Sequence, residues 1–197
     1  MKKVSFATIL LILIIFTLTG CDNAPKMPLP STYLRLEVEK TKPLSFNEKE
    51  YPFTFQYPNN ITIEKLDSKS KRIRWFNLNY KKYNFVVNVS YIPLNNVSSL
   101  RASIEDCYTF LKRHEKLSGG IIEQDYKNEE KHIYGTVFEI KGSDVVSPMQ
   151  FYLTDSNKYF VRFALNCNFK PNNDSCQVII HQIKKDMTGI INTFNWK

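Results

Sequence analysis

The chain has 197 residues, of which 43% are hydrophobic and 23% are charged. This length suits one domain of ordinary size, and such a domain can bury a core without the help of disulfides or a metal. The 27 basic and 19 acidic residues give a net charge of +8, which invites comparison with proteins that bind nucleic acid. Because the basic residues are scattered, the sequence favours a solvated basic surface and no nucleic-acid partner, with attraction to a membrane surface as the alternative.

The first 20 residues have the layout of a signal peptide. Lys2 and Lys3 precede an apolar stretch from Val4 to Leu18, followed at once by small and polar residues. The stretch is short for a hydrocarbon core of about 30 Å, which needs roughly 20 apolar residues. The sequence from 18 to 21, "LTGC", resembles a bacterial lipoprotein box, in which a small residue precedes the cut and a thiol follows it. We therefore predict a signal peptide over 1–20; the alternative is an uncleaved anchor in which Cys21 is incidental.

Cys21 is the predicted lipidation site. Each buried methylene of an acyl chain contributes about 0.8 kcal/mol, so the two or three palmitate-like chains expected on this thiol would anchor the protein firmly. Residues 21–32 contain three prolines and no apolar periodicity, which predicts an extended tether. No acidic run follows Cys21, and this favours a lipoprotein of the cell envelope that faces the periplasm.

Residues 33–197 are predicted to form a single α+β domain. Alternation of apolar and polar residues predicts strands over 51–58, 74–80 and 84–92, and again over 120–128, 132–142 and 148–166, the last folded back on itself around 155–157. Two helical stripes interrupt them: one begins at Val97 after a cap at Asn95 or Asn96, and the other begins at Asp174 or Ser175. This order predicts a mainly antiparallel sheet with two principal helices, an arrangement similar to Mog1/PsbP-type domains.

The sequence carries no recognisable catalytic motif. A G-x-S-x-G pentapeptide and a phosphate-binding glycine loop are both missing. "HEKLS" at 114–118 lacks the second histidine of a zinc-protease helix. The histidines at 114, 132 and 181 are isolated, and the adjacent carboxylates at 105–106 and 129–130 do not face each other. We predict no enzyme, no metal and no cofactor.

Five residues are candidates for an interaction site. Arg162 interrupts an otherwise apolar strand, and such a charge must be paired or lie at the rim of the sheet. It is either a structural arginine with a carboxylate partner or a residue that binds a partner protein. Gln150, Tyr152 and Asp155 belong to the same predicted hairpin, and Trp75 lies on the polar face of the strand over 74–80.

Three further cysteines follow Cys21. Cys107 falls on the apolar stripe of the first helix and is predicted to be a buried small hydrophobe. Cys167 and Cys176 flank a short polar loop, and the periplasm is oxidising. The sequence allows a disulfide between these two and leaves open whether it forms.

The chain resembles the gliding-motility lipoprotein GldD family of Bacteroidetes. The resemblance runs from "YLRLE" at 33–37 through "YPFTFQYP", "WFNLNY", "SPMQFYLTDS" and "KPNNDS" to "TFNWK" at the end. The cysteines at 167 and 176 and "GSDVV" before Ser147 depart from the family pattern. The resemblance implies a non-enzymatic component of the gliding machinery and the associated type IX secretion system, whose partners are other envelope proteins and the membrane.

Two other functions compete with this interpretation. The first is a periplasmic module that binds a small ligand between the sheet and its helices, for which we expect a deep apolar pocket with a few polar groups. The second is an enzyme, which would require a cluster of titratable residues that are distant in the sequence, for example His132 meeting Asp155 and Arg162 in the fold.

Overall fold

The computed structural model describes residues 40–66, 73–115, 118–142, 145–169 and 174–197. All of these belong to one compact unit, Tyr33–Lys197. The predicted signal peptide over 1–20, the lipidation site Cys21 and the tether over 21–32 lie outside the described residues.

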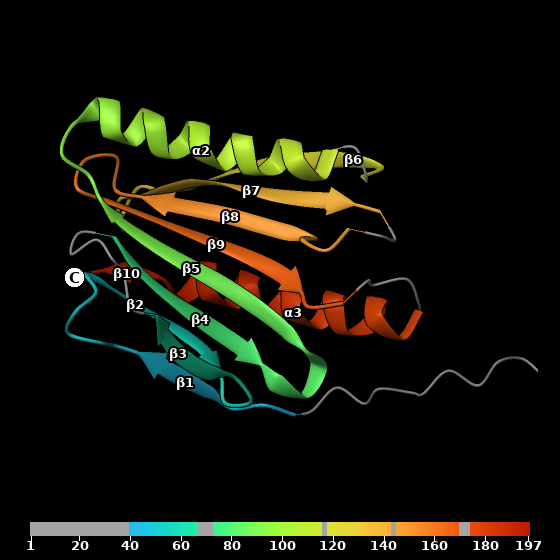
Figure 1. Ribbon diagram of the computed structural model, residues 1–197. Helices are drawn as coiled ribbons and strands as arrows, with labels where there is room; N and C mark the ends of the chain where they lie inside the picture. The colour runs from blue at the N-terminus through green and yellow to red at the C-terminus, as the bar shows by residue number, and fades with distance from the viewer. Residues whose placement is uncertain (1–39, 67–72, 116–117, 143–144, 170–173) are drawn as a thin grey trace, which may run out of the picture. The chain divides into compact units, whose positions relative to one another are not determined.

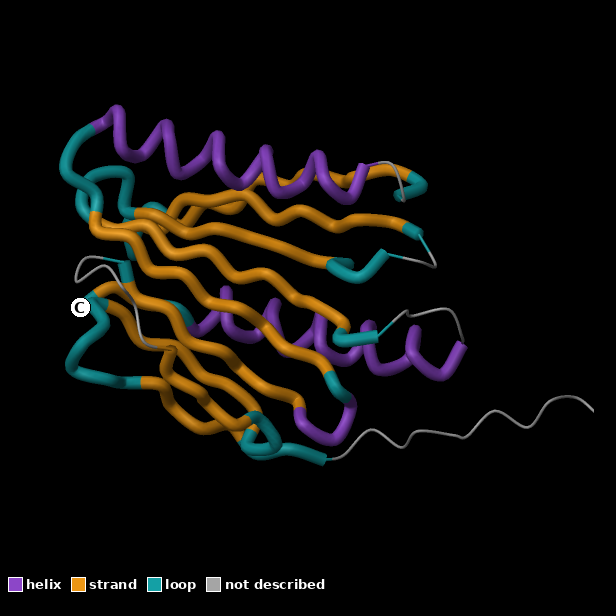
Figure 2. The backbone as a smooth tube through the Cα atoms, in the orientation of Figure 1, coloured by secondary structure: helices purple, strands orange, loops and turns teal. Residues whose placement is uncertain are grey.

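A seven-stranded sheet forms the centre of the domain, with the strand order β3-β4-β5-β9-β8-β7-β6 (Figures 1 and 2). Every pair of neighbours in it is antiparallel. Its strands are β3 (Thr62–Leu66), β4 (Arg74–Tyr80), β5 (Phe85–Pro93), β6 (Gly120–Asn128), β7 (Ile133–Lys141), β8 (Met149–Thr154) and β9 (Tyr159–Cys167). The predicted antiparallel α+β fold is therefore confirmed.

Smaller elements complete the domain. A second sheet has the order β1-β2-β10. The two long helices are α2 and α3, and a short 3-10 turn, η1, connects β4 to β5. Their bounds are β1 (Pro43–Phe46), β2 (Phe53–Pro58), β10 (Asn195–Trp196), α2 (Val97–Glu115), α3 (Asp174–Thr193) and η1 (Lys81–Tyr83).

Local sequence explains where these elements begin and turn. The Asn96 Oδ1 atom accepts a hydrogen bond from the Ser99 backbone N–H at 2.8 Å, and the Ser99 hydroxyl accepts one from the Asn96 backbone N–H at 3.2 Å. This reciprocal cap confirms Asn96 as the start of α2. After η1, Asn84 takes a left-handed conformation with φ of 57°, which asparagine tolerates better than most residues. The chain can therefore reverse into β5.

The inner face of the large sheet carries the main hydrophobic core. α3 packs against it mainly with isoleucines, and the small sheet packs against it with aromatic side chains. Phe46 stacks on Phe55 and Phe76 with ring centroids 4.7 and 4.9 Å apart, and Phe151 stacks on Phe163 at 4.5 Å. The predicted strand over 51–58 exists as β2, but it belongs to the small sheet, which covers this core.

The outer face of the same sheet is covered over only part of its width. Residues of α2 pack with residues of β7, β8 and β9 in a second, smaller core. Figure 1 shows α2 on that side of the sheet, while β4 and β5 have no helix in front of them. We call the outward-facing side chains of β3, β4 and β5 outside the α2 core the open outer face: Thr62, Glu64, Leu66, Trp75, Asn77, Asn79, Val86, Asn88 and Ser90.

Candidate functional site

A groove of about 340 Å³ lies where the cover of α2 ends. Its floor comes from outward-facing residues of β5, β8 and β9, and its wall comes from the last turns of α2. We call it the Arg162 groove, and it is lined by Asn88, Ser90, Phe110, Arg113, His114, Gln150, Arg162, Ala164 and Asn166.

Arg162 is half-buried at the centre of this groove, and uncharged groups hold it in place. Its Nη2 atom donates a 2.6 Å hydrogen bond to Gln150 Oε1, and Gln150 Nε2 donates to Ser147 Oγ at 2.9 Å. Its Nε atom is buried and has no hydrogen-bond partner among the described residues. Burial lowers the pKa of the guanidinium, and Asp106 and Cys107 act on it in the opposite direction. The carboxylate partner expected for a structural arginine is not among the described residues.

Phe110 brings a second guanidinium to the same place. The Arg162 Cζ atom lies 4.2 Å from the centroid of the Phe110 ring, and the Arg113 Cζ atom lies 4.9 Å from it. Both are cation–π contacts, which favour a charged group over an aromatic face. His114 lies beside them, and its pKa is lowered by burial and by the two arginines. The groove therefore concentrates positive charge.

Asparagine side chains connect the groove to the open outer face. Asn166 donates to Asn88 Oδ1 at 2.6 Å, and Asn88 donates to Asn77 Oδ1 at 2.7 Å, so the chain of amides crosses β9, β5 and β4. Farther along, Asn79 donates to Glu64 Oε2 at 2.9 Å. Such a row offers hydrogen-bonding groups to a polypeptide laid across the strands.

Trp75 and Leu66 add an apolar spot to this face. They are paired across β3 and β4, and their side chains are 38% and 40% exposed. Trp75 also pairs with Ser90 of β5, which in turn pairs with Arg162 of β9. Tryptophan and arginine are enriched at the centres of protein interfaces.

The structure thus brings three of the five predicted interaction residues to the groove or to the open outer face. Gln150 and Arg162 line the groove, and Trp75 lies on the open outer face. Tyr152 points to the same side but is buried beneath α2, where its hydroxyl accepts a 3.0 Å hydrogen bond from Thr136. Asp155 accepts hydrogen bonds from three backbone N–H groups of its own turn, at residues 157–159. Its role in the structure is to hold the β8–β9 turn.

Sequence reasoning missed the wall of the groove. Phe110, Arg113 and His114 are spaced i, i+3 and i+4 on α2, which places them on one side of the helix. That spacing was the available signal, but nothing in it indicates that this side faces Arg162. Among the described residues, no hydrogen bond or ion pair joins His132 to Asp155 or Arg162, and no group of His, Cys, Asp and Glu is arranged to hold a metal ion.

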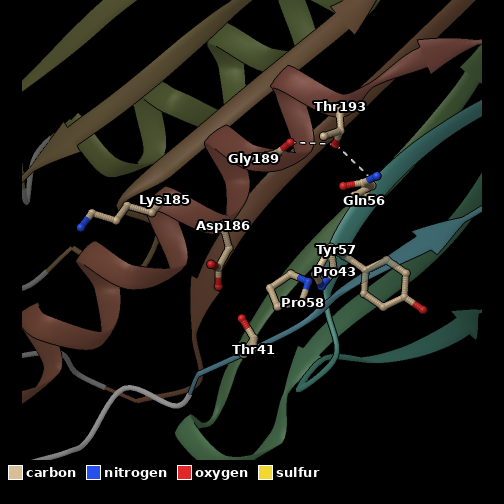
Figure 3. A pocket seen from close by; sticks show the side chains of 9 residues that line it. All are labelled: Thr41, Pro43, Gln56, Tyr57, Pro58, Lys185, Asp186, Gly189 and Thr193. Atoms are coloured by element: carbon tan, nitrogen blue, oxygen red, sulfur yellow. Dashed lines mark hydrogen bonds between the residues drawn. The ribbon is translucent and has the colours of Figure 1, made fainter.

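A second cavity, the α3 cleft, opens between α3 and the small sheet and measures about 230 Å³ (Figure 3). Asp186 points into it, while Lys185 points away. The two carboxylate oxygens of Asp186 accept hydrogen bonds from Tyr80 Oη at 3.1 Å and from Gln182 Nε2 at 2.9 Å. Burial raises the pKa of this carboxyl, and the two hydrogen bonds oppose that shift. The cleft is lined by Thr41, Pro43, Gln56, Tyr57, Pro58, Lys185, Asp186, Gly189 and Thr193.

The three cysteines of the domain are buried in the structure. Burial raises the pKa of Cys107 to about 11 and that of Cys167 to about 12, and the nearby Cys176 adds to the second shift. Cys107 is part of the core beneath α2, where the sequence placed it. The disulfide between Cys167 and Cys176 stays a prediction.

The fold belongs to a known class. The solution structure of cyanobacterial PsbP (CyanoP) from Synechocystis sp. PCC 6803 is similar, with a TM-score of 0.50 and 12% sequence identity over 81% of this chain and 95% of that one. At this identity the likeness concerns the fold alone, and it confirms the predicted PsbP-like architecture. A search of curated proteins found no match.

A family model for the gliding motility lipoprotein GldD matches residues 23–196. The chain therefore belongs to the GldD family of gliding motility lipoproteins, as the sequence motifs indicated. Membership implies a part in gliding motility and attachment to a membrane of the cell envelope, and the family is not a known class of enzyme. In the described part of the chain, none of the helices has the length and apolar character needed to cross a membrane.

Proposed function

We propose that this lipoprotein is a non-enzymatic accessory component of the gliding machinery and of the associated type IX secretion system. Acyl chains on Cys21 hold it to an envelope membrane, and the domain faces the periplasm. It acts by docking on other envelope proteins and so helps to assemble or stabilise the apparatus. Family membership supports the role in gliding and the attachment to an envelope membrane. The outer face of the sheet supports docking on other proteins.

One observation carries the docking proposal: half of the outer face has no helix over it in the described part of the chain. On that half, an exposed tryptophan and leucine lie next to a row of amides and a groove that holds two arginines. Apolar anchors beside polar and charged groups are typical of protein interfaces. A monomeric domain gains nothing in stability from exposing Trp75, whereas a partner that covers it removes apolar surface from water.

A small-ligand-binding module draws less support. The α3 cleft, at about 230 Å³, is smaller than the roughly 300–1,000 Å³ of typical ligand pockets. Its carboxylate already has a hydrogen bond to each oxygen. The Arg162 groove and a cavity of about 590 Å³ between α3 and the strands β7 and β8 are larger, but polar and charged side chains line most of both, whereas a ligand pocket is mostly apolar.

Deletion of the gene tests the role, with complementation to locate it. We expect the deletion strain to lose spreading and secretion of type IX cargo, and the wild-type gene to restore both. Cys21→Ser should fail to restore them because the protein would not be anchored. Trp75→Ala should restore them only in part, while Val178→Ala, which truncates an exposed residue of α3, should restore them fully. A deletion strain that still spreads and secretes would refute the proposal.

A further inference from the structure

The two arginines of the Arg162 groove differ from four lysines of the domain that form ion pairs. Lys65, Lys127, Lys141 and Lys184 each form an ion pair with a glutamate. Neither Arg162 nor Arg113 forms one with a described residue, although Arg162 is half-buried. Taking a cation out of water costs free energy unless an anion or hydrogen bonds compensate. Gln150 compensates Arg162 in part, and the buried Nε remains unpaired.

The Arg162 guanidinium is also held in a fixed orientation. Gln150 accepts a hydrogen bond from its Nη2 atom, Ser147 accepts one from Gln150, and its Cζ atom lies over the Phe110 ring. A planar guanidinium that is already oriented loses little conformational entropy when it binds, and its donors match the two oxygens of a carboxylate. Gln150 uses one Nη2 hydrogen, and the Nη1 atom, which is not among the buried unpaired atoms, has no described partner.

We propose that the Arg162 groove binds a carboxylate of a partner protein, either an acidic side chain or a chain terminus, in an extended segment that continues across the open outer face. This inference rests on the docking function proposed above and names the chemistry of the partner. A groove of about 340 Å³ accommodates one or two residues. The amides of Asn166, Asn88 and Asn77 continue from it as hydrogen-bonding groups for a backbone. Trp75 and Leu66 offer an apolar contact beside them, in the row of paired residues that runs from Arg162 through Ser90.

A lipid headgroup is the competing anion, and the surroundings of the groove favour a protein. Membrane-surface sites rely on clusters of several lysines and arginines, whereas this groove holds two arginines and a histidine among neutral amides. The open outer face also presents Glu64, which would repel an anionic bilayer lying against it.

His114 provides an internal reporter. Burial lowers the pKa of His114, Arg162 on β9 and Arg113 on α2 lower it further, and the other groups that line the groove are uncharged. A bound carboxylate would offset the two arginines and raise the pKa of His114. By linkage, the affinity for the carboxylate must then increase as pH falls through the pKa of His114 in the complex.

Peptide titration of the purified full-length lipoprotein in detergent tests the proposal. The probes are a hexapeptide with capped ends and a central glutamate, the same peptide with glutamine, and the glutamine peptide with a free carboxyl terminus. Calorimetry measures affinity, and NMR follows the pKa of His114. We expect both carboxylate peptides to bind and to raise that pKa, and the capped glutamine peptide to do neither.

Variants assign the binding to the groove. Arg162→Met should weaken binding of the glutamate peptide by about tenfold or more, the effect of losing a charge-assisted hydrogen bond. Arg162→Lys, which keeps the charge but not the planar fork, should fall between this variant and the wild type. Arg113→Gln changes an exposed residue and carries little risk to folding, and it should also weaken binding. Arg101→Gln removes an exposed arginine of α2 that does not line the groove, and it should leave affinity unchanged.

Three results would overturn the proposal. The first is the absence of saturable binding by the glutamate peptide, and the second is equal binding of the glutamate and glutamine peptides. The third is an affinity for the glutamate peptide that neither Arg162→Met nor Arg113→Gln changes. Phosphatidylglycerol vesicles and inorganic phosphate serve as further probes. If these bind with the same dependence on Arg162 while the peptides do not, the groove is a phosphate or lipid site. Any of these failures can coexist with loss of gliding in the deletion strain, so the broader function is judged separately.

Discussion

Arg162 and Asp186 are both half-buried ionisable residues at the wall of a cavity, yet their surroundings differ. Each oxygen of Asp186 accepts a hydrogen bond, from Tyr80 or from Gln182. Arg162 has one hydrogen bond, an aromatic ring and a buried Nε without a described partner. Partial burial of a charge therefore does not by itself mark a binding site. The number of hydrogen bonds that the surroundings leave unmade is the better guide.

The difference follows from where each residue lies in the fold. Asp186 is on α3 next to residues that face the main core, so the hydroxyl of the core residue Tyr80 can reach it. Arg162 points to the outer face of β9 at the edge of the cover that α2 provides. One side of its guanidinium meets protein groups, and the other opens into the groove.

The largest effect is expected when the hydrogen bonding of Asp186 is broken. Tyr80→Phe removes the donor to one carboxylate oxygen and should lower the free energy of unfolding by roughly 1–3 kcal/mol. Urea unfolding measures this. Tyr57→Phe is the matched control, because the Tyr57 hydroxyl has no hydrogen bond to a described residue and points away from Asp186 in Figure 3. Equal losses in the two variants would show that Asp186 does not depend on Tyr80.

A smaller effect on stability is expected at Arg162. Arg162→Met removes a half-buried cation that has no described ion pair and keeps an apolar side chain on Phe110. The desolvation cost disappears together with one hydrogen bond, so the free energy of unfolding should stay within about 1 kcal/mol of the wild type. Urea unfolding gives this value too. A loss of several kcal/mol would mean that Arg162 is mainly structural.

The smallest effects are expected in how the free energy of unfolding changes with pH. The contributions of Asp186 and of His114 should change with pH in opposite directions. Burial raises the folded-state pKa of Asp186 above its ordinary 3.8. Its contribution to stability is therefore present below pH 3.8 and is lost as pH rises through the folded-state pKa. The pKa of His114 is lowered from 6.5. Its contribution is present above pH 6.5 and is lost as pH falls through the folded-state pKa.

Difference curves isolate these slopes. The unfolding free energy of the wild type minus that of Asp186→Asn should fall as pH rises from about 4, and the same difference for His114→Gln should fall as pH drops below about 6.5. Each slope has an upper limit of about 1.4 kcal/mol per pH unit for one group. A flat curve for either variant would contradict the corresponding pKa direction.

Much of the fold was predictable because it depends on local patterns. The alternation in "RWFNLNY" and "NFVVNVSYI" placed β4 and β5 correctly on their two faces, and the stripe from Val97 placed α2. The short strand β3 was missed: its residues Thr62–Leu66 are mostly exposed, so the sequence shows no apolar alternation there. The small sheet was missed as well, because β10 has only two residues and pairs with β2, far away in the chain.

The candidate site was predictable only in part, for the same physical reason. A charge within an apolar strand marked Arg162, and the hairpin marked Gln150. The sequence could not show that Phe110 of α2 would lie against the Arg162 guanidinium, since their contact joins two elements about fifty residues apart. It also could not separate Tyr152 from Gln150: both face outward on β8 and both are buried, but Tyr152 packs in the apolar core beneath α2, whereas Gln150 lines the groove and bonds to Arg162.

The sequence by itself determined the lipoprotein family, the types of the longer elements and the residues that face each side of strands such as β4 and β5, because these depend on motifs and on side-chain periodicity along a short segment. Only the tertiary structure decided how much of the outer face α2 covers, and so which polar residues are satisfied and which remain available. The extent of this cover depends on the packing of apolar side chains from distant segments. A local sequence pattern does not indicate where a helix ends over the surface of a sheet.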